Sequence, residues 1–137
     1  MQIFHVSPLA VLYSAIAQWL LGALWFGFVF RARWKALVGI PEGEKPKNAW
    51  FPMLASFVAN VVLSMLLAHL IKWSGATSLP RGVYVGAICW AGFIAPVMFT
   101  THIFERRPAK LFAINAAYWL LAMMIGGAIL GNLNNVG

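Results

Sequence analysis

The sequence predicts an all-α integral membrane protein in which four helices form a transmembrane bundle. Apolar residues make up 62% of the 137 residues and charged residues only 9%, which is too little polar surface for a soluble domain of this size. The charged residues are also grouped, because Asp, Glu, Lys and Arg are absent from four long stretches. These stretches are residues 1–30, 48–71, 82–104 and 111–137.

Each uncharged stretch is long enough for one helix across a bilayer, which needs roughly 20 apolar residues. The first stretch has no basic residue and is longer than the apolar part of a signal peptide, so we expect it to be retained. We therefore predict a single transmembrane domain over residues 1–137, with helices at about 8–30, 50–72, 82–103 and 109–131.

The positions of the basic residues predict the orientation of these helices. Eight of the ten Lys and Arg residues lie in or beside the first and third loops, at about 31–49 and 104–108. The positive-inside rule then places both loops in the cytoplasm and both termini outside, so that the chain forms two out-in-out hairpins. Lipid headgroups, not nucleic acid, are the expected partners of this charge.

Polar residues recur at four-residue spacing in the first two helices, which places them on one face of each helix. Because a polar side chain in hydrocarbon lacks a hydrogen-bond partner, we expect these faces to point into the bundle. The same reasoning predicts that Asn115 in the fourth helix points inward. The residues at this spacing are Ser14, Gln18, Gly22 and Phe26 in the first helix and Ser56, Asn60 and Ser64 in the second.

Proline and glycine predict further features of the helices. Pro52 and Pro108 stand near helix starts, where a missing N–H costs little, whereas Pro96 lies inside the third helix. There it predicts a kink that frees the carbonyl of Gly92. Two GxxxG pairs predict close helix packing within the chain, with self-association of two copies as the alternative. They are Gly82 with Gly86 and Gly127 with Gly131.

The two halves of the chain share a short pattern, Phe-x-x-Asn. It occurs once in the second helix, at 57–60, and once in the fourth, at 112–115. A parallel duplication of a two-helix unit would produce this pattern and would place both asparagines at one depth. A chance match is the alternative.

Amides and aromatic residues inside the helices are the candidates for ligand binding, because interior polar groups in membrane proteins are often functional. Each buried indole N–H needs an acceptor, and several aromatic rings together could line a pocket. Interhelical hydrogen bonding and core packing are the alternative. The candidate residues are Gln18, Trp25, Asn60, Trp90, Asn115, Tyr118 and Trp119.

The sequence predicts no catalytic, metal or cofactor site. Asp is absent, the single cysteine is Cys89 inside the third helix, and the predicted topology places His5 and His69 on the opposite side of the membrane from His102. At the cytoplasmic end of the third helix we predict an interface ion pair around Glu105 and Arg106. Its cation is expected from Arg31, Arg33 or Lys35, because Arg106 and Arg107 would point to other sides of a helix.

Two segments resemble a known family. Residues 104–108 (Phe-Glu-Arg-Arg-Pro), then Leu111 and residues 114–118 (Ile-Asn-Ala-Ala-Tyr), are similar to the signature of the domain-of-unknown-function 1761 family, and residues 22–26 (Gly-Ala-Leu-Trp-Phe) to its first-helix motif. The resemblance implies a small bacterial inner-membrane protein of four helices without an assigned activity. It also singles out Trp25, Glu105, Arg106, Pro108, Asn115 and Tyr118.

Two classes of function follow. In the first, the aromatic and amide-lined interior binds or carries a small apolar or amphipathic molecule. In the second, the chain is a structural or accessory subunit of a membrane complex. An intramembrane enzyme is disfavoured by the few acids and histidines.

Overall fold

Each of the four uncharged stretches contains a long helix in the computed structural model, which describes residues 6–41 and 48–133. Predictions about His5, residues 42–47 and residues 134–137 lie outside this part of the chain. Two of the helices change into a π-helical turn (η) before they end or continue. The elements are α1 (Pro8–Leu24), η1 (Trp25–Val29), α2 (Arg31–Val38), α3 (Trp50–Ser74), α4 (Leu79–Cys89), η2 (Trp90–Ile94), α5 (Ala95–Phe104) and α6 (Ala109–Leu133).

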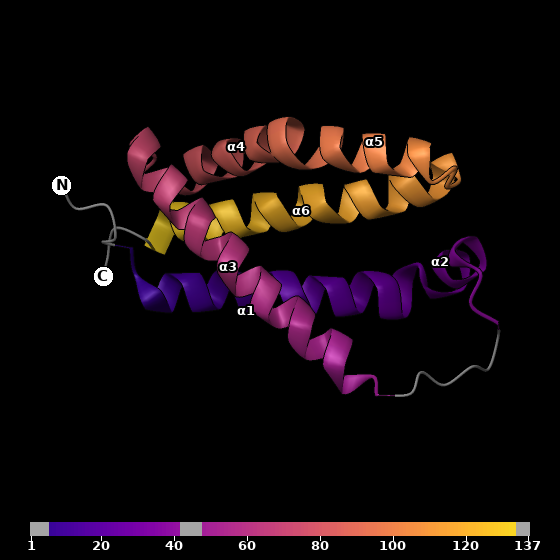
Figure 1. The fold of residues 1–137 in the computed structure, drawn as a ribbon. Coiled ribbons are helices and arrows are strands. Elements are labelled where there is room, and N and C mark those ends of the chain that lie inside the picture. The colour runs from indigo at the N-terminus through magenta and orange to yellow at the C-terminus, as the bar shows by residue number, and fades with distance from the viewer. Residues whose placement is uncertain (1–5, 42–47, 134–137) are drawn as a thin grey trace.

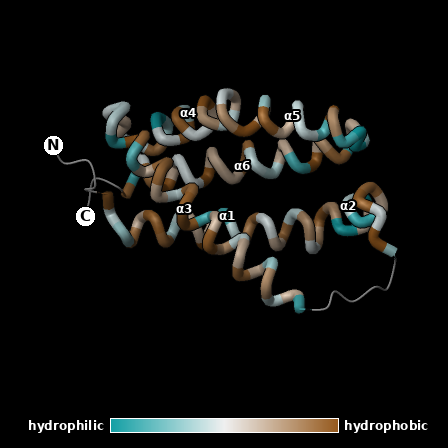
Figure 2. The backbone as a smooth tube through the Cα atoms, in the orientation of Figure 1, coloured by the Kyte–Doolittle hydropathy of each residue, from teal (hydrophilic) through white to brown (hydrophobic). Residues whose placement is uncertain are grey.

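Four continuous helical segments are long and apolar enough to cross a membrane, and the hydropathy colouring shows apolar residues along each of them (Figure 2). They are Pro8–Val29, Trp50–Ser74, Leu79–Phe104 and Ala109–Leu133. Hydrophilic residues gather at α2 and at the turn between α5 and α6, which lie at the same end of the molecule (Figure 1). The start of α1 and the end of α6 lie at the opposite end.

Helix α6 lies between α1 on one side and α4 and α5 on the other, while α3 crosses obliquely (Figure 1). Small residues on α6 let both neighbours approach. A Cβ atom on Gly82 of α4 would overlap the carbonyl oxygen of Gly127, and one on Gly126 would overlap the amide nitrogen of Gln18 in α1. The predicted GxxxG glycines therefore pack against one another within the chain, which favours the intrachain role over self-association through the same residues.

Local sequence explains where several helices begin and end. The Ser7 hydroxyl accepts a hydrogen bond from the Ala10 N–H (3.2 Å) and Pro8 follows it, as is usual at a helix start. Helix α3 ends at Gly75, whose φ of 76° is left-handed. The N–H groups of Gly75 and Ala76 then bond back to Lys72 and Ile71, at 3.1 and 3.2 Å.

The structure differs from the sequence prediction in two places. The first loop, predicted at about 31–49, contains the eight-residue helix α2, which runs from Arg31 to Val38 and is followed by the left-handed Gly39 (φ 88°). A helix this short is easily missed in a basic segment, because it has no long apolar face. Before Pro96, where the sequence predicts a kink, the structure has the π-helical turn η2, in which the Ala95 N–H reaches back five residues to the Trp90 carbonyl.

Candidate functional site: a polar layer beside an apolar groove

Five buried polar side chains from three helices meet in the interior, and we call them the polar layer. The Ser14 and Ser64 hydroxyls share a hydrogen bond of 2.9 Å, and the Gln18 Nε2 donates to both of them, at 3.0 and 3.1 Å. The four-residue spacings of Ser14 with Gln18 on α1 and of Asn60 with Ser64 on α3 produce this meeting. The polar layer is Ser14, Gln18, Asn60, Ser64 and Tyr118, each at most 4% exposed.

Tyr118 is the residue of the polar layer that lies on α6. Its hydroxyl donates to the Gln18 backbone carbonyl at 3.0 Å, and the Asn60 side chain lies beside the same hydroxyl. The phenol reaches α1 because Gly22 has no side chain. A Cβ atom on Gly22 would lie only 3.0 Å from the hydroxyl oxygen. The sequence therefore places a glycine one turn beyond Gln18 to admit the ring.

Two amide oxygens of the polar layer have no hydrogen-bond donor within the part of the chain that the structure describes. They are Gln18 Oε1 and Asn60 Oδ1, on side chains that are 0% and 3% exposed. Leaving a buried acceptor unpaired costs about 1–3 kcal/mol, so native structures seldom tolerate it. The layer is thus short of hydrogen-bond donors at two positions.

Two tryptophans of the candidate set form hydrogen bonds that join the π-helical turns η1 and η2 to α6. The indole N–H of Trp25 donates to the Ile114 carbonyl at 3.1 Å, and that of Trp90 donates to the Ala116 carbonyl at 2.9 Å. Each tryptophan is also the first residue of a π-helical turn. Their indoles are therefore already paired and contribute no free donor to the interior.

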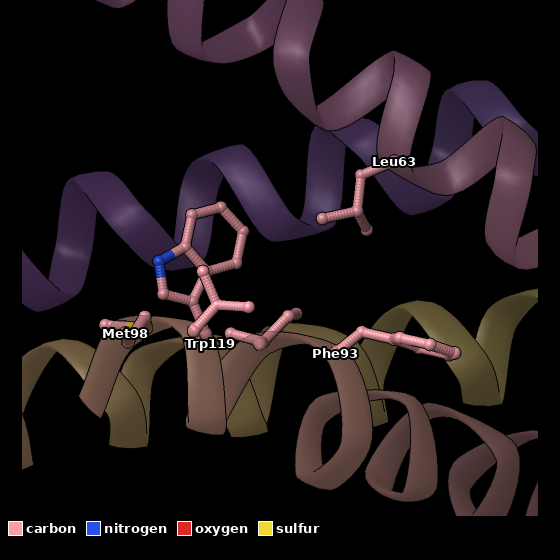
Figure 3. Close-up of a pocket in the computed structure, with 6 residues that line it drawn as sticks. Leu63, Phe93, Met98 and Trp119 are labelled. Carbon is pink, nitrogen blue, oxygen red and sulfur yellow. The ribbon is translucent and has the colours of Figure 1, made fainter. Parts of the chain in front are cut away.

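An apolar groove adjoins the polar layer between α3 and the segment of η2, α5 and α6 (Figure 3). It has a volume of about 220 Å³ and is largely open to the surroundings of the molecule. Its wall meets the layer on two helices, because Leu63 lies one turn from Asn60 on α3 and the Trp119 ring packs on Tyr118 at 4.9 Å. The lining residues are Leu63, Phe93, Ile94, Val97, Met98 and Trp119.

Asn115 lies apart from the polar layer. Its Nδ2 lies 3.5 Å from the His102 Nε2, and His102 Nδ1 lies 2.8 Å from the Met98 carbonyl. Because a carbonyl only accepts, Nδ1 carries the hydrogen and Nε2 accepts from the amide. Asn115 is half-buried, whereas Asn60 is buried, so the two asparagines serve different contacts.

The cation that pairs with Glu105 is a near neighbour in the chain. Arg107 Nε lies 2.6 Å from Glu105 Oε2, and in the described residues no ion pair joins Glu105 to Arg106 or to a cation of α2. The prediction of a partner at the end of the first helix is therefore wrong. It assumed that the helix continues past Glu105, but the left-handed Arg106 (φ 55°) ends it and turns Arg107 back toward the carboxylate.

No group of three or more His, Cys, Asp or Glu side chains is placed to hold a metal ion within residues 6–41 and 48–133. Of the residues that line the groove, only Trp119 was singled out from the sequence, because apolar residues that line a groove have the same chemistry as those that face lipid. One signal does mark this region. The pattern Trp-x-Gly-Phe followed by Val or Ile occurs at 25–29 and again at 90–94, where both π-helical turns form.

The fold defines an all-helical protein with four helices capable of spanning a membrane. Residues 9–131 match the family model described as a protein of unknown function, DUF1761, and the chain belongs to this family. No curated protein and no solved structure matches the chain.

Proposed function

We propose that the chain is a multi-pass protein of the bacterial inner membrane that binds a small amphipathic molecule taken from the bilayer. The molecule places its apolar chain in the groove and its polar head toward the polar layer. One observation carries this proposal: the apolar groove and the buried polar layer share neighbouring residues on α3 and α6.

The charge distribution supports an orientation with α2 and the α5–α6 turn in the cytoplasm. Six of the eight described Lys and Arg residues lie at that end, and only Lys72 and Arg81 lie at the other. Thr77 and Lys110 are exposed at opposite ends, so each can carry a reporter cysteine in a Cys89→Ala background. We expect an impermeant thiol reagent added outside cells to label Thr77→Cys and not Lys110→Cys. The reverse labelling would overturn the orientation.

The groove has the properties of a site that a molecule enters from the bilayer. Phe93 is 71% exposed and Val97 62%, so the groove opens along a surface that faces hydrocarbon in the proposed orientation. Ordinary lipid chains also contact such a surface. What distinguishes this groove is its position: Leu63 lies within one turn of Asn60, and Trp119 follows Tyr118 in the chain, so the polar layer is the nearest place for the head of an amphipathic molecule.

A photoactivatable long-chain alcohol tests the groove in purified protein in phosphatidylcholine nanodiscs. We expect cross-links in peptides that contain Leu63, Phe93 or Trp119, and a large excess of the unlabelled alcohol should compete them away. Leu63→Trp should fill the groove and abolish this labelling. Val62→Trp is the matched control, because Val62 is 47% exposed on the same helix and does not line the groove. Uniform labelling that neither the competitor nor Leu63→Trp reduces would overturn the proposal.

A second function, docking of the chain as an accessory subunit, is supported by a different surface. From Trp50 to Ala59 every residue of α3 except Phe57 is exposed, and Trp50 and Phe51 are 65% and 62% exposed. Large apolar patches of this kind often bind other proteins. Purification in mild detergent should then yield a stoichiometric partner that Phe51→Ser releases and Val62→Ser retains.

A further inference from the structure

The two unpaired oxygens of the polar layer indicate the chemistry of the molecule that binds there. Gln18 Oε1 and Asn60 Oδ1 accept hydrogen bonds and cannot donate them. The nitrogen of the Gln18 amide is already used by two serine hydroxyls, and the Asn60 amide faces the Tyr118 hydroxyl, which itself donates to the Gln18 carbonyl. The binding partner must therefore be a hydrogen-bond donor.

The charge of the donor follows from its surroundings. The polar layer consists of two amides, two serines and one tyrosine, and none of these side chains is an acid or a base at neutral pH. A cation would lose its hydration in the interior without gaining a counter-charge, which costs several kcal/mol even after relaxation. A neutral O–H group pairs with an amide oxygen without that cost.

The two residues that carry these oxygens are linked through Ser64. Gln18 bonds to Ser64, and Asn60 precedes Ser64 by one turn on the same face of α3. Asn60 is in turn one turn from Leu63, which lines the groove. Asn60 does not itself line the groove, so the head of a molecule whose chain lies there would have to reach Asn60 past Leu63.

We infer that Gln18 Oε1 and Asn60 Oδ1 form a binding site for a neutral hydroxyl group, which selects alcohols among the amphipathic molecules that enter the groove. This inference rests on the proposed function, which supplies the amphipathic molecule that carries the hydroxyl group. Water carries the same O–H chemistry and is the second source of such a donor, so the experiment has to distinguish the two.

The test compares four single-chain probes of equal length that compete for groove labelling in phosphatidylcholine nanodiscs. They are a primary alcohol, its methyl ether, the corresponding ammonium ion and the carboxylate. We expect the alcohol to bind about tenfold more tightly than the ether, which is the factor for loss of one buried hydrogen bond. Asn60→Leu should bring this ratio close to one. Asn115→Leu, which removes an amide outside the polar layer, should leave it unchanged.

The wild-type ranking of the probes remains informative if Asn60→Leu fails to fold. A preference for the ether or the ammonium ion would overturn the inference, because it would show that the site offers a donor or stabilises a charge. Equal binding of alcohol and ether supports the inference only if NMR shows a water in contact with the Gln18 and Asn60 side-chain amides, which identifies water as the donor. Equal binding without such a water overturns it.

The same experiment separates this inference from the proposed function. If no probe competes for labelling of the groove, the proposed function fails, while the water measurement still tests the two oxygens. If all four probes compete equally and no water is found, the groove binds amphipathic molecules and the hydroxyl site fails.

Discussion

The two π-helical turns, η1 and η2, have nearly the same sequence but different continuations. Both begin with Trp-x-Gly-Phe, and in both the first tryptophan donates its indole N–H to a carbonyl of α6, at Ile114 or Ala116. After η1 the chain bends at Phe30 (φ −113°, ψ 18°) into α2, whereas after η2 it continues through Pro96 into the ten residues of α5.

The difference shows which feature goes with a π-helical turn in this fold. Pro96 follows only one of the two turns, so proline is not required. The tryptophan contact with α6 is common to both. A buried indole N–H needs an acceptor, and a turn with one extra residue changes the direction in which the side chains point. We conclude that the paired tryptophans fix the two turns against α6 from opposite sides.

The largest expected effect on stability is that of substituting a glycine where α4 contacts α6, compared with a glycine in the π-helical turn η2. Gly82→Ala should lower the free energy of unfolding by about 3 kcal/mol or more, because its Cβ would overlap the Gly127 backbone, which has no rotamer to change. Gly92→Ala in η2 meets nothing within 4 Å and should raise stability by about 0.5–1 kcal/mol. Unfolding in detergent measures both, and equal losses would show that η2 packs as tightly as α4.

The two tryptophans themselves come next. Trp25→Phe and Trp90→Phe should each lower the free energy of unfolding by about 1–2 kcal/mol, because each loses an indole hydrogen bond and part of its packing. The loss should be larger for Trp90, which also packs against a cluster of buried apolar residues that includes Leu67, Ile71 and Leu130. Trp73→Phe, at a position 65% exposed, is the control and should change little. A larger loss of unfolding free energy for Trp25→Phe than for Trp90→Phe would contradict this prediction.

The four long helices could be predicted because a charge inside hydrocarbon is costly, so the gaps between charges mark them. The inward faces of Gln18 and Asn60 also followed from four-residue spacing. The separate environments of Asn60 and Asn115 did not follow, because the shared Phe-x-x-Asn pattern gives no information about the helix that each residue faces. The π-helical turns were missed for a related reason: a turn that adds one residue leaves no trace in composition, and only the repeated Trp-x-Gly-Phe marks it.

The Glu105 partner could not be predicted because the end of α5 depends on one backbone angle. Arginine rarely adopts a positive φ, so nothing in the sequence indicates the left-handed turn that a glycine would have indicated. The N–H groups of Arg106 and Arg107 bond back to Ile103 and His102, at 3.1 and 2.9 Å, as in a glycine-ended helix.

This helix end predicts a pair of substitutions with opposite effects. Arg106→Gly should raise the free energy of unfolding by about 1 kcal/mol, since it relieves a left-handed non-glycine residue without removing the ion pair of Glu105. Gly75→Ala, at φ 76° with open space around it, should lower it by about 1 kcal/mol. Destabilisation by Arg106→Gly would mean that the arginine side chain makes a stabilising contact.

The smallest expected effect is that of Pro96→Ala, and it tests the conclusion about the two turns most directly. If the tryptophan contact fixes η2, the new N–H at residue 96 should leave the turn in place and change stability by less than about 1 kcal/mol. If proline causes the turn, alanine should restore an ordinary helix and shift α5 by one residue, a rotation of about 100°. That rotation would carry His102 away from Asn115, whose side-chain amide donates to it at 3.5 Å. The NMR resonance of the Asn115 side-chain amide should therefore stay unchanged in Pro96→Ala, and it should shift in Trp90→Phe if loss of the indole contact releases the turn.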